Sequence, residues 1–285
     1  MQALAQLATE TTPTRGGRHS TRVTKLRPNW PLMLRATSPS VPGRVFAWAG
    51  QDVAPAGVCL AAGAAGPLGG DQLRLEAHVG EGSALVLGEI SPTLLLPGPH
   101  GAVSRLDIRL HVGAGATLTW LPELTIAAHG CRHITDVRVT LEEDARLLLR
   151  EEVLFGRHGE QPGAYRQRLR VFGSGRPLYD QELAVGQQAP GWAGAAITAN
   201  RRASGTLLLI ASSHRCERLY VPVAQGAYAR LMPLAGHGLL YSALASDTGT
   251  LRRQLDETVE YFVRYFDPAE RDLPEVSLGN PQRIN

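Results

Sequence analysis

Residues able to do chemistry gather in four short segments, and the first is the glycine-rich loop 63–71, which ends in Asp71. Such loops cradle phosphate when they lead into the N-terminus of a helix. This loop leads instead into an alternating, strand-like pattern and lacks a Gly-Lys-Ser/Thr ending, so we do not expect a nucleotide site. Because glycines let the backbone approach closely, the loop favours a carboxylate held in a fixed position. A simple turn at Asp71 is the alternative.

The second segment places His129, Cys131 and His133 at every second position. If this segment is a strand, the three side chains share one face, and imidazole with thiolate is a ligand set for Ni, Zn or Cu. No second motif at metal-ligand spacing accompanies them, and single histidines are commonly structural. The three residues are therefore candidate metal ligands, and a structural role is the favoured alternative.

The third segment brings carboxylates and a guanidinium group together, in Glu151, Glu152, Arg157 and Glu160. Paired carboxylates transfer protons in active sites or bind a divalent cation weakly. The same residue types are also common on solvated surfaces. Because no histidine motif accompanies them, general acid–base catalysis is not favoured.

The fourth segment, Ser-Ser-His at 212–214, sets a nucleophile beside a base. Catalytic triads, however, are assembled from residues that are distant in the sequence. The chain has neither a Gly-x-Ser-x-Gly nor a His-Glu-x-x-His motif, so a hydrolase is not expected. The lack of a persuasive active site favours a binding or assembly role.

Composition narrows the classes of function further. The chain has 285 residues, 44% of them hydrophobic and 19% charged, with a formal net charge of +3. This length fits one domain or two closely joined domains with a full core. The charge is too small to indicate nucleic-acid binding. Many Gly and Pro residues with few aromatic residues favour many short strands.

The cysteines and the apolar stretches indicate a cytoplasmic protein. Cys59, Cys131 and Cys216 are an odd, widely spaced set without a Cys-x-x-Cys pair, which fits a reducing compartment better than a disulfide framework. No apolar run approaches the ~18 residues of a membrane span. The N-terminal arginines follow the short apolar stretch, so residues 1–24 do not have the pattern of a secretory signal.

A strand–turn–strand pattern recurs about every thirty residues. In each copy, apolar and polar residues alternate up to a turn of glycines or acidic residues, and a second apolar run follows. The turns begin at residues 80, 113, 142 and, in a weaker copy, 173. Such alternation indicates strands with one buried face, stacked around a continuous core. The predicted fold is mainly β, a helical or solenoid-like stack of short strands with one or two helices towards the C-terminus; an ordinary β-sandwich is the alternative.

The pattern divides the chain into three regions. Residues 1–28 are polar and are predicted to form a disordered tail. Residues 29–245 form the β domain, which includes a strand at 206–210. Residues 246–285 hold an amphipathic helix and an extended tail. The apolar residues of the helix recur at steps of four and three, and they are Leu251, Leu255, Val259, Phe262, Val263 and Phe266.

Five segments, taken in order, carry a recognisable pattern. They are the loop and strand 66–75, the stretch Trp-Leu-Pro-Glu-Leu-Thr-Ile at 120–126, Gly130-Cys131, the stretch 145–157 that ends in Gly156-Arg157, and Gly-Thr-Leu-Leu-Leu at 205–209. Together they resemble the urease accessory protein UreD family, also called UreH, over roughly residues 40 to 245. The chain departs from the family pattern at Leu124, where proline is usual, and at 88–97, which lacks a common Thr-Gln-x-Ala-Thr-Lys stretch.

The resemblance implies a β-helical scaffold with a couple of helices, and not an enzyme. It implies a chaperone in metallocentre assembly that binds apo-urease on one side and the UreF–UreG complex on the other. Such a protein assists GTP-dependent nickel insertion, with UreG as the GTPase. Nickel is expected to pass through an internal channel, so Ni²⁺ is a transient cargo and no tightly bound cofactor is expected.

A channel for Ni²⁺ needs oxygen ligands at intervals that bind weakly enough to release the ion. Isolated carboxylates meet this need better than the His-Cys-His segment. We therefore expect Asp71, Glu123 and Glu151 to transfer the metal, and Arg157 to brace a neighbouring carboxylate. The aromatic residues of the C-terminal helix, Phe262 and Phe266, are candidate docking residues, with packing against the β stack as the alternative.

Two other functions stay open. The departures at 88–97 and Leu124 are compatible with a non-catalytic β-solenoid interaction module without metal transfer. A metal-dependent hydrolase that uses His129, Cys131 and His133 would bind metal tightly and turn over substrate by itself.

Overall fold

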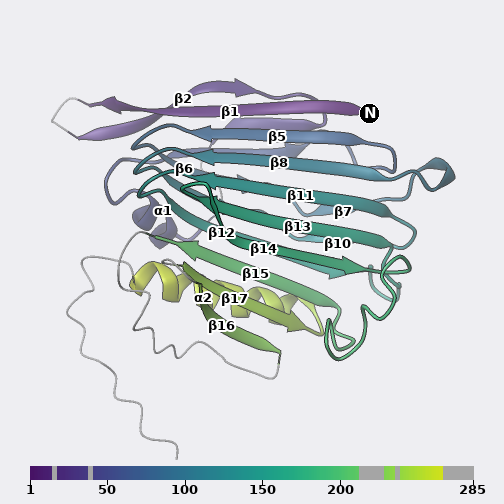
Figure 1. Cartoon of the computed structure of the whole chain (residues 1–285). Helices are drawn as coiled ribbons and strands as arrows, with labels where there is room; N and C mark the ends of the chain where they lie inside the picture. Colours follow the sequence, from purple (N-terminus) through teal and green to yellow (C-terminus); the bar gives the residue numbers. More distant parts are fainter. Residues whose placement is uncertain (15–17, 38–40, 212–227, 235–237, 266–285) are drawn as a thin grey trace, which may run out of the picture.

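The chain winds back and forth between two β-sheets, as a β-solenoid of about four turns. A computed structural model describes residues 1–14, 18–37, 41–211, 228–234 and 238–265. Figure 1 shows the strands stacked from the N-terminal end towards the C-terminal end, each laid beside a strand of the preceding turn. The predicted fold class, a mainly β stack of short strands, is confirmed.

Each sheet collects strands that are far apart in the sequence. The seven-stranded sheet contains, in spatial order, β14 (Arg176–Val185), β13 (Ala164–Gly173), β11 (Arg132–Leu141), β8 (Ser104–Val112), β5 (Gln72–Val79), β1 (Gln2–Pro13) and β2 (His19–Arg27). The ten-stranded sheet contains β16 (Ala229–Leu234), β17 (Gly238–Ala245), β15 (Ala203–Ile210), β12 (Arg146–Phe155), β9 (Thr117–Leu121), β6 (Ala84–Glu89), β4 (Ala56–Ala62) and β3 (Leu32–Ala36), with β10 (Thr125–Ala127) beside β12 and β7 (Thr93–Leu95) beside β10. The helical elements are α1 (Gly43–Ala49), the 3₁₀ turn Pro99–Gly101 and α2 (Thr248–Tyr265).

Three tight corners carry the chain from the seven-stranded to the ten-stranded sheet, and they are the turns predicted at 80, 113 and 142. Each corner has one residue with a positive φ, namely Gly82 at 59°, Gly115 at 62° and Asp144 at 55°. Gly and Asp adopt this conformation more readily than other residues. The successive corners stack the strands in parallel, with β5, β8, β11 and β13 in register.

The fourth predicted turn has a different role. At 173–175 the chain reverses within the seven-stranded sheet, and β14 pairs antiparallel with β13. Ser174 and Gly175 both have positive φ, 48° and 76°, and two such residues in succession make the tight hairpin turn that matches strand twist. The weaker fourth copy is therefore a hairpin and not another corner of the solenoid.

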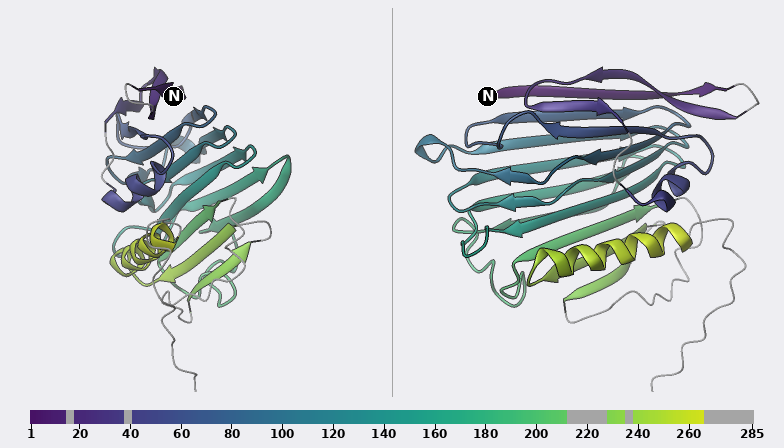
Figure 2. Two further views of the ribbon diagram at one scale, coloured as in Figure 1. Left: turned by 90° about the vertical axis from the view of Figure 1, so that its left-hand side faces the viewer. Right: turned by 180° about the vertical axis from the view of Figure 1, so that it is seen from behind.

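Three hydrophobic cores lie among the described residues, and two of them hold the layers together. One lies between the sheets and takes the inward-facing residues of each strand. The other lies between the ten-stranded sheet and both helices, where Leu251, Leu255 and Phe262 of α2 are buried. Figure 2 shows α2 lying along the outer side of this sheet. Close approach is possible because β15 has Gly205, where a Cβ atom would lie 2.7 Å from a methyl carbon of Leu255.

The predicted amphipathic helix is confirmed by α2. Neither of the described helices combines the length and the apolar character required to cross a membrane.

The prediction of a disordered tail at 1–28 is wrong. Strand β1 pairs in parallel with β5 from Gln2 to Thr9, and β2 pairs antiparallel with β1. Ala3, Ala5 and Leu7 alternate on the buried face and extend the core between the sheets. Small alanines and the many Thr and Gln residues around them give a weak hydrophobic alternation, and pairing with β5 supplies the order that local sequence does not indicate.

Candidate functional site

Three cavities follow one another between the two sheets, and each shares lining residues with the next. The first, of about 50 Å³, is lined by Asp71 and Glu89 among others. The second, also of about 50 Å³, shares Glu89 with the first and is lined by Glu123 and Glu151. The third, of about 230 Å³, shares Glu151 with the second and reaches β15 and β17. Since roughly 10–15 Å³ holds a water molecule, this cavity row has room for water-sized occupants.

Asp71 is held rigidly at the first cavity by the glycine-rich loop. Its side chain is only 8% exposed, and its carboxylate accepts a hydrogen bond of 2.9 Å from the backbone N–H of Leu68. It also lies 3.1 Å from the amino nitrogen of Met1. Gly66 and Gly70 adopt φ values of 139° and 96°, which other residues rarely do. The loop therefore fixes the carboxylate in place, as its glycines indicated.

The wall of the second cavity contains a break in the ten-stranded sheet, which we call the seam. Strand β12 pairs with β9 as far as Leu149 and with β10 from Val153 onward. Between the paired stretches lies the connection 122–124, and 90–92 forms the corresponding connection between β6 and β7. Each connection contains a proline, which lacks the N–H that a continuous ladder needs.

Four carboxyl groups lie at the seam and line the second cavity, and two of them, Glu89 and Glu151, also line a neighbouring cavity. Burial raises the pKa of Glu89 to about 8, and the charge of Glu123 adds to this effect, although a hydrogen bond from the backbone N–H of Glu123 opposes it. Burial raises the pKa of Glu151 to about 7, against a hydrogen bond with Gln167. At pH 7 Glu89 is therefore mostly protonated and Glu151 about half protonated, and a cation that displaces the proton would restore the charge of either group.

The other two carboxylates of the seam pair with arginines on the outer side of the sheet. Arg252 of α2 lies 3.0 Å from Glu123 through Nη2 and 2.9 Å from Glu152 through Nε. Arg150 lies 2.9 Å from Glu152 and donates a 2.9 Å hydrogen bond to Asp256 of α2. The Glu152 side chain is 1% exposed. The seam thus has protonated carboxyl groups inside and ion-paired carboxylates outside.

The segment 129–133 does not form a metal site. His129 lies in the exposed turn before β11, whereas Cys131 and His133 are buried. Burial raises the pKa of Cys131 to about 11 and lowers that of His133 to about 4, so the thiol stays protonated and the imidazole neutral. The His133 ring nitrogens lie 2.7 Å from Ser104 Oγ and 3.0 Å from Thr135 Oγ1.

These contacts give His133 a structural role, which is the alternative that the sequence favoured for this segment. Within the described ranges, no group of three or more His, Cys, Asp or Glu side chains is arranged to hold a metal ion. The hydrolase hypothesis loses the ligand set that it required. The Ser-Ser-His segment at 212–214 lies outside the described residues.

Arg157 pairs with a carboxylate that the sequence had placed nearby. Its Nε donates a 2.9 Å hydrogen bond to Glu160, and its Nη2 lies 2.5 Å from the same group. These hydrogen bonds lower the pKa of Glu160 to about 2. Glu160 also accepts from the backbone N–H of His129, so the pair closes the turn that follows β12 and does not reach Glu151.

Phe262 is wholly buried in the core between α2 and the ten-stranded sheet. It is therefore not a docking residue in this fold, and the alternative of packing within the chain holds. Phe266 lies outside the described residues.

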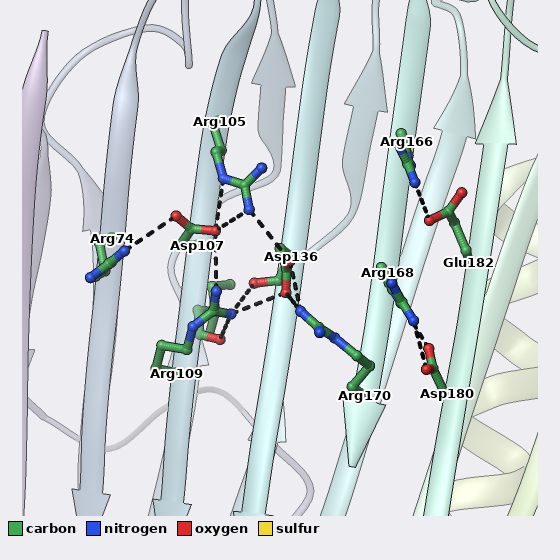
Figure 3. A network of polar contacts seen from close by, with 11 residues as sticks. Arg74, Arg105, Asp107, Arg109, Asp136, Arg166, Arg168, Arg170, Asp180 and Glu182 are labelled. Carbon is green, nitrogen blue, oxygen red and sulfur yellow. Dashed lines mark hydrogen bonds and ion pairs between the residues drawn. The ribbon is translucent and has the colours of Figure 1, made fainter. Parts of the chain in front are cut away.

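A network of charges covers the outer face of the seven-stranded sheet (Figure 3). Asp136 lies 3.0 Å from Arg109 and 2.7 Å from Arg170, and Asp107 lies 2.8 Å from Arg105. The strand alternation indicates that these residues face outward, but their pairing depends on the strand register. The network stabilises the wall of the cavity row from outside.

Two groups at the seam were missed from the sequence. Glu89 lies in the segment 88–97, which departs from the common family pattern. Its position at the end of an apolar run was the signal that could have indicated a buried carboxyl group. Arg252 interrupts the apolar face of the C-terminal helix, but nothing local indicates that it meets Glu123 and Glu152.

Comparison with known proteins agrees with the resemblance. A protein-family model described as "UreD urease accessory protein" matches residues 3–276. Urease accessory protein UreD 3 of Streptomyces griseus is 42% identical over 246 residues, which cover 85% of this chain and 91% of the relative. Urease accessory protein UreD of Streptomyces avermitilis is 40% identical over 261 residues, covering 91% and 98%. The Frankia alni protein of the same name is 41% identical over 264 residues, covering 85% and 88%. The chain therefore belongs to the UreD family of urease accessory proteins.

Proposed function

We propose that this protein is a scaffold for urease maturation that carries Ni²⁺ through its cavity row. It binds apo-urease and the UreF–UreG complex in the cytoplasm and assists GTP-dependent nickel insertion, with Ni²⁺ as cargo and no enzymatic activity of its own. The observation that carries the proposal is the succession of carboxyl groups along the row: Asp71 at the first cavity, Glu89 between the first and second, and Glu151 between the second and third.

This spacing suits transfer better than storage. Affinity rises with the number of ligands, so a cavity with one or two carboxyl groups holds Ni²⁺ weakly enough to pass it on. The protons on Glu89 and Glu151 also matter, because they keep the empty interior nearly neutral. An arriving Ni²⁺ displaces a proton, and the next carboxyl group takes the ion in the same way.

Glu123, which the sequence suggested as a transfer residue, has a different role in this proposal. Its carboxylate pairs with Arg252, so in this conformation it is not free for a cation. Glu89 replaces it as the transfer residue between Asp71 and Glu151. Glu123 then acts through its backbone N–H, which donates a hydrogen bond to Glu89.

The test is reconstitution with the host's apo-urease, UreF and UreG, in the presence of Ni²⁺, bicarbonate and GTP. The triple variant Asp71→Asn, Glu89→Gln, Glu151→Gln should form the same complexes in a pull-down but activate urease much more slowly. The matched control is Glu81→Gln with Glu143→Gln, two exposed glutamates of the corners that connect the sheets. This control should activate urease as the wild type does.

Two results would redirect the proposal. Normal activation by the triple variant, with complexes intact, would favour an interaction module without metal transfer, the function left open by the departures at 88–97 and Leu124. Failure of the wild-type chain to bind urease or UreF would remove the maturation role itself.

A further inference from the structure

The second cavity reaches through the ten-stranded sheet at the seam. Its lining includes Glu151 and Trp120, which face the other sheet, and also Glu152, which faces α2. Lining residues from both faces of one sheet are possible here because the ladder on one side of β12 is interrupted between its pairing with β9 and its pairing with β10. The seam is therefore a place where the cavity row approaches the outer side of the protein.

The guanidinium group of Arg252 spans this place from the outside. It contacts Glu123 on the connection that forms one side of the seam and Glu152 on β12, which forms the other side. A planar guanidinium suits such bridging because its donors lie in a rigid fork. The Arg252 side chain is 30% exposed, whereas Glu152 behind it is 1% exposed. The Arg252 side chain thus covers the buried carboxylate of Glu152 and separates it from solvent.

We propose that Arg252 seals the seam and keeps a cation in the second cavity from leaving sideways. The inference rests on the proposed passage of Ni²⁺ through the cavity row. Arg252 acts in two ways: it joins the two sides of the break, and it sets a positive charge where a divalent cation would otherwise find Glu123 without an ion pair and Glu152 paired with Arg150 alone. It is a positioning residue, because it acts through Glu123 and Glu152 and not on the ion's own ligands along the row.

Helix α2 offers a matched control for this charge. Arg253 follows Arg252 directly, is exposed, and donates a hydrogen bond to Thr250 Oγ1 within the same helix turn. Arg252→Gln and Arg253→Gln therefore remove the same charge from the same helix, but only the first breaks the bridge across the seam. The apolar face of α2, with Leu251 and Leu255 fully buried, keeps the helix docked in both variants.

The experiment measures how well transfer resists a chelator. The complete assembly with apo-urease, UreF and UreG is loaded with Ni²⁺, and GTP is then added together with EDTA, with Mg²⁺ in excess so that GTP keeps its magnesium. The wild type and Arg253→Gln should activate urease to nearly the same level with and without EDTA. Arg252→Gln should activate urease normally without EDTA and lose most of the activation when EDTA is present. Arg252→Lys keeps the charge without the fork and should lie between the two.

Three results would overturn the seal. If Arg252→Gln resists the chelator as well as the wild type does, the seam does not leak without Arg252. Equal sensitivity of Arg252→Gln and Arg253→Gln shows a general effect of helix charge. Chelator sensitivity of the wild type shows that the passage is not enclosed at all, which removes the seal together with that part of the proposed function. If Arg252→Gln melts well below the wild type, Arg252→Lys decides. Partial chelator resistance of Arg252→Lys that falls at raised ionic strength supports the seal, and resistance equal to that of the wild type at every ionic strength overturns it.

Discussion

Arg252 on helix α2 lies 2.9 Å from the carboxylate of Glu152 on strand β12, although 100 residues separate them in the sequence. A second pair runs beside it, from Arg150 on the strand to Asp256 on the helix, also at 2.9 Å. The two pairs can form together because the distance from Arg252 to Asp256 along the helix matches that from Glu152 to Arg150 along the strand. Four residues along a helix rise about 6 Å, and two residues along a strand rise about 6.6 Å. Two opposite-charge pairs therefore fix the position of α2 along β12, where apolar contacts alone would tolerate sliding.

These two ion pairs predict unequal losses in the free energy of unfolding when Glu152 and Asp256 are each replaced by the amide. Glu152→Gln leaves the buried Arg150 and the half-buried Arg252 without their shared carboxylate, and removing one partner of a buried pair typically costs about 3–5 kcal/mol. Asp256→Asn affects a carboxylate that is 51% exposed, and the expected loss is about 1 kcal/mol or less. Urea denaturation of both variants measures the free energies of unfolding. Equal losses would show that Glu152 does not hold the cluster together.

The corners and strands of the solenoid were predictable because their signals are local. The turns at 80, 113 and 142 contain the residues that tolerate positive φ, and the strands before them alternate clearly. Strand β1 was not predictable in the same way, since its order depends on pairing with β5. The hairpin at 173–175 shows the limit of a repeat pattern, because the same residue types there reverse the chain within one sheet.

The candidate site was predictable only in part. Asp71 and Glu151 line the cavity row as carboxyl groups of the kind expected, but Glu123 is paired with Arg252 and Glu89 lies between them. The difference arises from contacts between residues far apart in the chain. For the same reason the sequence did not reveal that Cys131 and His133 are buried away from His129.

Glu89 predicts that the free energy of unfolding falls as the pH rises towards 8. Its pKa is about 8 in the fold, against the ordinary value of 4.5 for an exposed glutamate. Between these values the folded state binds a proton that the unfolded state has released, so stability decreases with rising pH and levels off above about 8. Glu89→Gln removes this contribution, and the stability of the variant should depend less on pH between about 5 and 8.

Chemical denaturation at a series of pH values measures this difference directly. Glu81→Gln, in the exposed corner after β5, is the control and should keep the wild-type profile. A Glu89→Gln profile parallel to that of the wild type would mean that Glu89 is ionised at neutral pH. The resting interior of the cavity row would then carry negative charge, contrary to the proposed transfer.

The buried His133 predicts that the free energy of unfolding changes with pH in the opposite direction at acidic pH. Burial lowers its pKa from 6.5 to about 4, so below pH 6.5 the unfolded chain gains a proton that the folded chain does not yet bind. Stability is therefore lost as the pH falls from 6.5 towards 4. At one pKa unit per 1.36 kcal/mol, the contribution amounts to about 3 kcal/mol.

His133→Gln should be less stable than the wild type at pH 7, because the contacts with Ser104 and Thr135 change. The gap between the two proteins should narrow as the pH falls from 6.5 to 4.5, which thermal melts at matched ionic strength can follow. His129→Gln, at the exposed turn, should track the wild type throughout. A constant gap would show that the fold does not lower the pKa of His133.

The position of Asp136 on the outer face of the seven-stranded sheet predicts that its replacement lowers the free energy of unfolding by an amount that depends on the salt concentration. Arg109, Arg138 and Arg170 stand in register on β8, β11 and β13, and like charges on neighbouring strands repel. Although burial alone raises the pKa of Asp136, hydrogen bonds from Arg170 and Arg109 lower it, so the carboxylate is charged and offsets the repulsion. Asp136→Asn should cost about 1.5–3 kcal/mol, as expected for hydrogen bonds to a charged group.

Asp180→Asn is the matched control, because Asp180 pairs with Arg168 on the same face and both side chains are 42% exposed. An exposed pair contributes about 0–1 kcal/mol, so this variant should unfold close to the wild type. Raising the salt concentration screens the arginine repulsion, and Asp136→Asn should therefore regain part of its stability while Asp180→Asn changes little. Equal losses in the two variants, or a loss in Asp136→Asn that salt does not reduce, would show that register repulsion is not what Asp136 offsets.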